Sequence, residues 1–232
     1  MTRSKQSRVH SAPYAKLVLP TLPIVFHRMR LFRLLDKSQA RRLIWITAPA
    51  GAGKTTLVAS YLKSKRVPVL WYRLDESDAD PSSFFSFLSV AARSLAPRFK
   101  RPLPVLTPEY ALGLQTFARR YFQALGARLP RRCRIVLDNY QDIPAQAGLH
   151  QLLACGVYEL PDGISVVVMS RQGPCSPMAR LLAEQMIASI GPDPLRLSRA
   201  ETLGVARLHL KSQKQRMARS RIDELHNKAG GW

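Results

Sequence analysis

The stretch Leu43-Ile44-Trp45-Ile46-Thr47, followed directly by Ala48-Pro49-Ala50-Gly51-Ala52-Gly53-Lys54-Thr55-Thr56, decides the fold of this chain. Its first five residues form strands readily, and apolar residues recur at helical spacing after the glycines. Strand, glycine-rich turn and helix in this order are typical of a P-loop. The stretch therefore predicts an α/β domain of the P-loop NTPase class, with a parallel sheet flanked by helices.

The loop itself has the properties that a polyphosphate ligand requires. Gly51 and Gly53 carry no side chain, so backbone N–H groups can approach phosphate oxygens closely. The following helix adds partial positive charge at its N-terminus, Lys54 offers an ammonium group to the phosphates, and Thr55 offers a hydroxyl to Mg²⁺. Glycine is usual at the first position of this pattern, where this chain has Ala48. We predict that residues 48–56 bind ATP with Mg²⁺.

Two other predicted strands end in candidate catalytic residues. Residues 134–138 read as a strand that ends in Asp138, and we expect it to neighbour the strand before the loop. From there Asp138 would hold Mg²⁺ together with Thr55. Arg171 follows a strand predicted over 164–170, at the sheet edge where ligands of such folds bind. We expect it to contact the γ-phosphate; the alternative is a solvated arginine.

The remaining elements follow from apolar spacing and turn residues. We expect Ser82 or Ser83 to cap a helix, His150 to cap or pack on a helix rather than to catalyse, and residues 1–15 to be a flexible basic lead. The pattern predicts one more strand, over 67–74, and helices over 28–40, 82–95, 109–127, 148–159, 178–188, 198–211 and 217–229.

The composition restricts the compartment and the partners. With 36 Lys and Arg against 15 Asp and Glu, the formal net charge is +21, which favours binding of polyanions such as nucleic acid; the alternative is a merely solvated basic surface. The three cysteines lack metal-ligand spacing, and no apolar run approaches the roughly 18 residues of a membrane helix. We expect a cytoplasmic protein without membrane contact.

With these elements placed, the chain resembles the N-terminal ATPase module of large LuxR-family transcriptional regulators of the MalT type, a branch of the STAND NTPases. The resemblance extends over residues 16–232 and includes the loop at 48–56. Its other motifs are Trp71-Tyr72-Arg73-Leu74-Asp75-Glu76, Leu137-Asp138-Asn139-Tyr140, Ser170-Arg171, Leu195-Arg196-Leu197-Ser198 with Glu201, and Gly230-Gly231-Trp232.

This resemblance implies an organisation and a role. We expect an NTPase domain over 16–194 and, over 195–232, the start of a winged-helix segment that is truncated here. Apolar surface around Leu208, Leu210, Leu225 and Trp232 would then stay exposed or recruit a second copy. The resemblance implies an ATP-driven switch for a DNA-reading domain, and we expect that domain to be absent from this sequence.

The resemblance also bears on catalysis. Family members usually have a second acidic residue where this chain has Asn139, so we expect at most a slow ATPase, unless Asp142 or Glu76 orients the attacking water. Two alternatives remain open: a free-standing P-loop kinase or hydrolase, and a basic protein that binds nucleic acid without reading its sequence.

Overall fold

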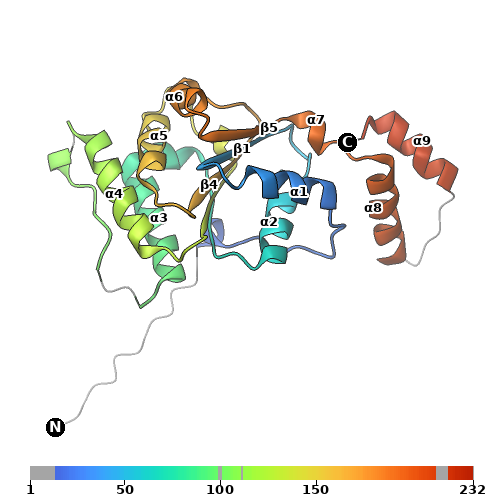
Figure 1. Cartoon of the computed structure of the whole chain (residues 1–232), viewed down its shortest axis with the longest axis horizontal. Coiled ribbons are helices and arrows are strands. Elements are labelled where there is room, and N and C mark those ends of the chain that lie inside the picture. Colours follow the sequence, from blue (N-terminus) through green and yellow to red (C-terminus); the bar gives the residue numbers. More distant parts are fainter. Residues whose placement is uncertain (1–13, 99–100, 111, 213–218, 232) are drawn as a thin grey trace, which may run out of the picture.

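The computed structural model describes residues 14–98, 101–110, 112–212 and 219–231 (Figure 1). At its centre is a parallel sheet with the strand order β2-β3-β4-β1-β5. The strands are β1 (Leu43–Thr47), β2 (Val69–Arg73), β3 (Arg134–Asp138), β4 (Ser165–Ser170) and β5 (Ile187–Ile190).

Helices cover both faces of this sheet, as predicted. Alternate side chains of a strand point to opposite faces, so Leu43 and Trp45 join one apolar cluster while Ile44 and Ile46 join the other. The first cluster lies under α3 (Pro81–Leu95), α4 (Leu114–Arg128) and α5 (Leu149–Glu159), and the second under α1 (Met29–Ser38) and α2 (Lys54–Lys65) (Figure 1). Burial on both faces explains why these strands are almost wholly apolar.

The helix predicted over 178–188 is wrong in its second half. Helix α6 (Ala179–Ala183) is short, and β5 follows it after a turn in which Gln185 has a φ of +54°. The apolar residues of α6 and β5 happen to continue one helical spacing across this turn. Strand β5 lies at the sheet edge and buries only its two end residues, so the alternation that marks a strand is absent.

The predicted cap of α3 is also wrong. Asp80, rather than Ser82 or Ser83, is the N-cap, and its carboxylate accepts a hydrogen bond of 2.9 Å from the Ser83 N–H. Pro81 takes the first helical position, where its missing N–H costs nothing and its fixed φ suits the helix.

The C-terminal part of the chain forms a helical hairpin beside the α1–α2 layer (Figure 1). After α7 (Pro192–Leu195) come α8 (Arg199–Ser212) and α9 (Arg219–Ala229), and Ile222 is buried between them. The Leu197 N–H donates to the Gly231 carbonyl at 2.7 Å and closes the hairpin at its base. The predicted lead lies outside the described residues over 1–13, as does Trp232. Leu225 is half exposed.

The structure bears on two expectations from the composition, those on membrane helices and on the cysteines. None of their helices has both the length and the apolar character needed to cross a membrane. The three cysteines are free thiols; Cys133 is buried at the start of β3, and burial raises the pKa of its thiol to about 11. Cys133 is therefore an unreactive core residue.

Candidate nucleotide-binding site

The loop between β1 and α2 has the backbone conformation of a phosphate-binding turn. Gly51 and Gly53 have φ angles of +76° and +78°, a left-handed conformation that favours glycine. No atom lies within 4 Å of a Cβ built at either position, so the space above both glycines is open. Ala48 is buried, and its N–H donates to the Ser170 carbonyl at 3.2 Å, so a small residue fits where the general pattern has glycine.

Lys54, the first residue of α2, folds back over this loop. Its Nζ donates to the carbonyl oxygens of Ala48 at 2.6 Å and Pro49 at 2.9 Å. Burial is the main cause that lowers the pKa of Lys54, and the positive charge of Arg171 adds to it, while Asp138 acts in the opposite direction. Both of these carbonyl partners are neutral, and a phosphate group bound here would give the Lys54 ammonium group a negatively charged partner.

Thr55 and Asp138 meet across the carboxyl end of the sheet. The Thr55 hydroxyl lies 3.2 and 3.1 Å from the two carboxylate oxygens of Asp138. The expectation that their strands are neighbours is wrong, because β4 lies between β1 and β3. The first turn of α2 spans this gap and carries Thr55 to Asp138. Together they offer Mg²⁺ a hydroxyl and a carboxylate oxygen, the hard ligands that this ion prefers.

Asp138 is buried, and burial raises the pKa of its carboxyl group. The Thr55 hydroxyl and the Asn139 N–H, which donates to the carboxylate at 3.0 Å, favour the ionised form, as do the charges of Arg73 and Lys54. Together they only partly offset burial, and a divalent cation bound to the carboxylate would stabilise its ionised form further.

The backbone conformation at position 139 explains why an asparagine is found there. Its φ is +61°, in the left-handed region where asparagine and aspartate are the commonest residues after glycine. It begins a short 3-10 helix (Tyr140–Asp142) next to the loop. Of the two acids considered as substitutes, Asp142 is exposed and accepts a bond from Gln141, and Glu76 lies exposed beyond the end of β2.

Arg171 follows β4 directly and is exposed. Its N–H donates to the Gln141 side-chain oxygen at 3.1 Å, which joins the segments after β3 and β4. The positive charge of Arg171 contributes to the lowered pKa of Lys54. His150, in contrast, is a packing residue on α5: its ring nitrogens bond to the Tyr140 hydroxyl and the Pro144 carbonyl at 2.8 and 2.9 Å.

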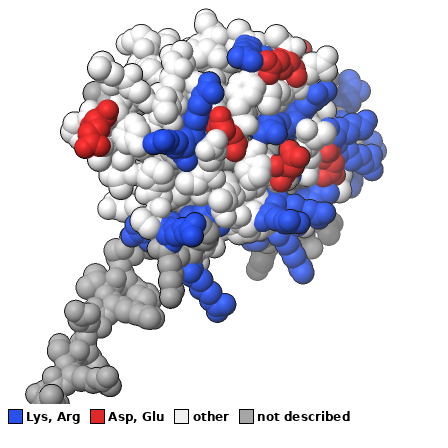
Figure 2. Space-filling model, turned by 60° about the vertical axis from the view of Figure 1, so that its left-hand side comes forward, with Lys and Arg blue, Asp and Glu red and all other residues white. Residues whose placement is uncertain are grey.

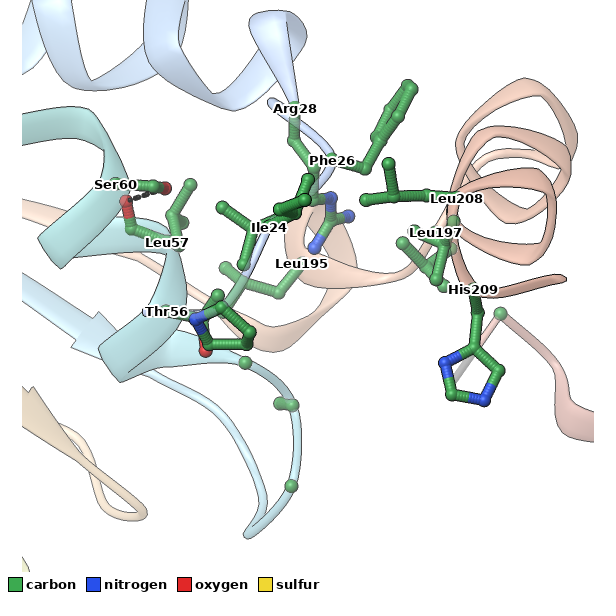
Figure 3. Close-up of a pocket in the computed structure, with 17 residues that line it drawn as sticks. Ile24, Phe26, Arg28, Thr56, Leu57, Ser60, Leu195, Leu197, Leu208 and His209 are labelled. Atoms are coloured by element: carbon green, nitrogen blue, oxygen red, sulfur yellow. Dashed lines mark hydrogen bonds between the residues drawn. The ribbon is translucent and has the colours of Figure 1, made fainter. Parts of the chain in front are cut away.

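An apolar pocket of about 1100 Å³ opens beside the loop (Figure 3). Ile24, Leu57, Leu195 and Leu208 converge on it from four separate segments. Gly51, Ala52 and Gly53 form its border with the phosphate loop. The pocket could therefore bind a flat apolar ring whose attached phosphate chain is held by residues 48–56. The other lining residues are Pro23, Val25, Phe26, Arg28, Thr56, Ser60, Leu197, Val205, His209 and Gly231.

Sequence reasoning did not assign this pocket to the site. Residues 17–26 are an apolar stretch that contains two prolines, and no local pattern in them indicates a contact with residues 195–209. The fold brings the two together through α8. Phe26 packs so closely on Gly204 that a Cβ there would lie 2.2 Å from its ring.

An ion-pair cluster fixes the same two segments to each other. The Glu201 carboxylate accepts bonds of 3.1 Å from Arg28 and from Arg30, and both arginines also donate to the Arg196 carbonyl. Glu201 further accepts the Ser198 N–H at 2.9 Å while its own N–H donates to the Ser198 hydroxyl, a capping box that starts α8. Glu201 thus ties the pocket's N-terminal wall to α8.

Comparisons with known proteins agree with this geometry. Residues 24–171 match the family described as Nephrocystin 3, N-terminal. The chain belongs to this family. It is 31% identical over 176 residues to the HTH-type transcriptional regulator MalT of Cronobacter sakazakii, and 29% identical over 180 residues to MalT of Vibrio cholerae. Each match covers 75% of this chain and 19% of the regulator, so the chain spans about a fifth of the length of these relatives.

Solved structures confirm the fold. A STAND protein with a tetratricopeptide repeat sensor from Pyrococcus horikoshii superposes with a TM-score of 0.60 at 17% identity, over 91% of this chain and 29% of that one. A Walker-type ATPase of Pyrococcus abyssi gives 0.56 at 14% identity, over 88% and 63%. The predicted fold class and the resemblance to the ATPase module of MalT-like regulators are therefore confirmed.

Proposed function

We propose that the chain is an Mg-ATP-binding switch module of a MalT-like transcriptional regulator. One observation carries the proposal: a left-handed glycine loop, the Thr55–Asp138 contact and an apolar pocket lie side by side. Each suits a different part of ATP, namely the phosphates, the metal ion and the base.

The residues divide the work of binding as follows. Backbone N–H groups of residues 48–56 and the N-terminus of α2 hold the phosphates, and Lys54 exchanges its loop carbonyls for phosphate oxygens. Thr55 and Asp138 hold Mg²⁺, which supplies charge neutralisation when bound. Arg171 lies at the end of β4 near Lys54, where a guanidinium can contact the γ-phosphate. The base lies in the apolar pocket between Ile24 and Leu195.

Hydrolysis is slow in this proposal. Asp138 is committed to the metal, and the adjacent side chain of Asn139 is a carboxamide that cannot accept a proton from water. Positioning and metal charge still act, so the chain is at most a slow ATPase. A slow rate keeps the ATP-bound state populated, which suits a switch.

In this proposal, helix α8 transmits nucleotide binding to the C-terminal hairpin. Because both Ile24 and Leu208 line the pocket, a bound base would connect the N-terminal wall to the C-terminal hairpin. We expect Mg-ATP to slow amide hydrogen exchange in α8 and α9 of the native chain, and to leave exchange unchanged in Lys54→Ala. Equal exchange of the hairpin with and without Mg-ATP, despite demonstrated binding, would show that the hairpin does not sense the nucleotide.

The charge favours a second partner, nucleic acid bound without sequence reading. The formal net charge is +21, and Figure 2 shows Lys and Arg gathered toward one side of the face in view. Phosphate neutralisation requires no base contacts, so two unrelated duplexes should compete equally and lose affinity steeply with salt. A clear preference for one duplex would indicate a base-reading element.

The location of the chain in the cytoplasm belongs to the same proposal. So does the division into an NTPase domain over 16–194 and the start of a winged-helix segment over 195–232. Self-association through the exposed apolar side chains of the hairpin, such as Leu225 and Val205, is part of it as well.

A further inference from the structure

A second, polar cavity lies at the opposite edge of the sheet, where the strands begin. It has a volume of about 60 Å³ and is formed by two turns and the first residue of β3. One turn, residues 39–42, joins α1 to β1, and the other, residues 161–165, joins α5 to β4. Three of its lining residues are arginines, namely Arg41, Arg42 and Arg134. The Arg41 guanidinium donates to the Gln185 carbonyl at 2.6 Å.

Arg134 is a buried cation whose hydrogen-bond partners among the described residues are all neutral. One of its terminal nitrogens donates to the carbonyl oxygens of Arg132 and Cys133 at 3.2 Å and of Gly163 at 2.8 Å. The other donates to the Gln39 side-chain oxygen at 3.0 Å. Over the described ranges no carboxylate lies within ion-pair distance of it, and burial lowers the pKa of Arg134. A buried cation without a counter-ion is costly to the fold.

The hydroxyl of Ser165 is the second unusual group. Ser165 is only 3% exposed, and among the described residues its Oγ has no hydrogen-bond partner. It lines the same cavity as the arginines. A buried polar atom without a partner usually marks the place of a water or ligand atom.

One carboxylate, that of Asp162, lies at the rim of this cavity. Arg42 donates to the carbonyl oxygens of Tyr158 and Leu160, which end α5, and contacts Asp162 at 3.3 Å. The Asp162 side chain is fully exposed, so water screens its charge. Three arginines therefore line the cavity against one solvated carboxylate.

We propose that this cavity binds a small tetrahedral oxyanion of the phosphate class, independently of the nucleotide loop. Its oxygens would accept hydrogen bonds from the guanidinium groups and from the Ser165 hydroxyl, and its charge would compensate Arg134. The space exceeds the roughly 10–15 Å³ that one water needs and suits a single anion of this size. The bound anion joins the starts of β1, β3 and β4.

The test uses inorganic phosphate and the full chain carrying Lys54→Ala, which disables the phosphate loop. Calorimetric titration at constant ionic strength should show saturable binding of one phosphate per chain. Adding Ser165→Ala or Arg41→Gln should weaken this binding about tenfold or more, since the first removes a donor and the second removes a positive charge beside the cavity. Arg180→Gln, which removes an exposed arginine on α6, is the matched control and should leave the affinity unchanged.

Two results would overturn the proposal. One is the absence of saturable phosphate binding by the Lys54→Ala chain, with its fold verified by circular dichroism; the cavity then holds water only. The other is an unchanged affinity in both Ser165→Ala and Arg41→Gln, which would place the phosphate elsewhere. Neither result bears on ATP binding, because the two sites lie at opposite edges of the sheet.

Discussion

The hydroxyl of Thr55 lies 3.1 Å from a carboxylate oxygen of Asp138, although the two residues are 83 positions apart and strand β1, which precedes the loop and Thr55, is not adjacent to β3. The contact exists because α2 starts directly above the sheet and β3 ends in a buried aspartate. Burial raises the pKa of that aspartate, and the hydrogen bonds from Thr55 and Asn139 with the charges of Arg73 and Lys54 offset this only in part. The pair is thus arranged to bind a cation, and without one the buried Asp138 carboxylate lowers the stability of the fold.

Asp138→Asn should make the protein more stable and less able to use Mg²⁺. Since burial raises the folded-state pKa of Asp138, the ionised carboxylate opposes folding above that pKa, and the penalty disappears below the unfolded value of about 3.9. The melting temperature of the variant should therefore exceed that of the native chain at pH 7, and the difference should vanish on acidification. A lower melting temperature at pH 7 would show that the ionised carboxylate is stabilising.

Glu201→Gln should loosen α8 from the N-terminal wall of the pocket. The amide keeps an oxygen for the cap but leaves Arg28, whose side chain is only 12% exposed, without a carboxylate. We expect a loss of about 1–3 kcal/mol in the opening free energy of α8, measured by hydrogen exchange. Arg180→Gln, which breaks an exposed ion pair, should have almost no effect.

The Glu201 effect should depend on pH. Burial disfavours its ionised form, but the Ser198 N–H, Arg28 and Arg30 together outweigh burial and lower the pKa of Glu201. The stabilisation is therefore complete above the ordinary value of about 4.3 and is lost as pH falls through the lower folded-state pKa. Exchange rates of α8 that rise equally with acid in the native chain and in Glu201→Gln would contradict this assignment.

Gly53→Ala should separate folding from binding. A Cβ at this position meets no atom within 4 Å, so the change costs only the left-handed backbone conformation, about 1–2 kcal/mol. The added methyl group would occupy space that the phosphates need, so nucleotide binding should be lost. Gly173→Ala, where a Cβ is also unobstructed and φ is not positive, is the control and should bind normally. A Gly53→Ala chain that binds ATP like the native chain would move the phosphates away from this loop.

Asn139→Asp should raise the rate of ATP hydrolysis. Aspartate also tolerates the left-handed conformation at a φ of +61°, so the backbone should not change. The native chain should turn over well below about one ATP per second, at the low end of enzyme rates. Rapid turnover by the native chain would favour the free-standing enzyme instead, and a rate that stays the same in Asn139→Asp would direct attention to Asp142 or Glu76.

The sequence predicted those parts of the site whose chemistry lies in one short segment. The loop at 48–56 combines strand, glycines, lysine and helix within a few residues, and its spacing alone indicates its conformation. Strands β1 and β3 were predicted with their observed bounds, because both faces of each are buried and their sequences are apolar throughout.

The missed features depend on contacts that no local pattern encodes. The pocket forms because residues 23–28 meet α8 through Phe26 and Gly204, a pairing of distant segments. Strand β5 was mistaken for helix because an edge strand buries too few side chains to alternate. The partner of Asp138 was predicted, but the place of its strand was wrong, since strand order follows from the crossovers and not from the strand sequences.

The most direct test of the central claim is calorimetric titration of ATP, with Mg²⁺ present, into the native chain and into Lys54→Ala. The native chain should bind one ATP per molecule, and Mg²⁺ should strengthen binding in the native chain but not in Thr55→Ala. Lys54→Ala, folded like the native chain by circular dichroism, should show no detectable binding. An unchanged ATP affinity in folded Lys54→Ala would contradict the assignment of this loop as the nucleotide site.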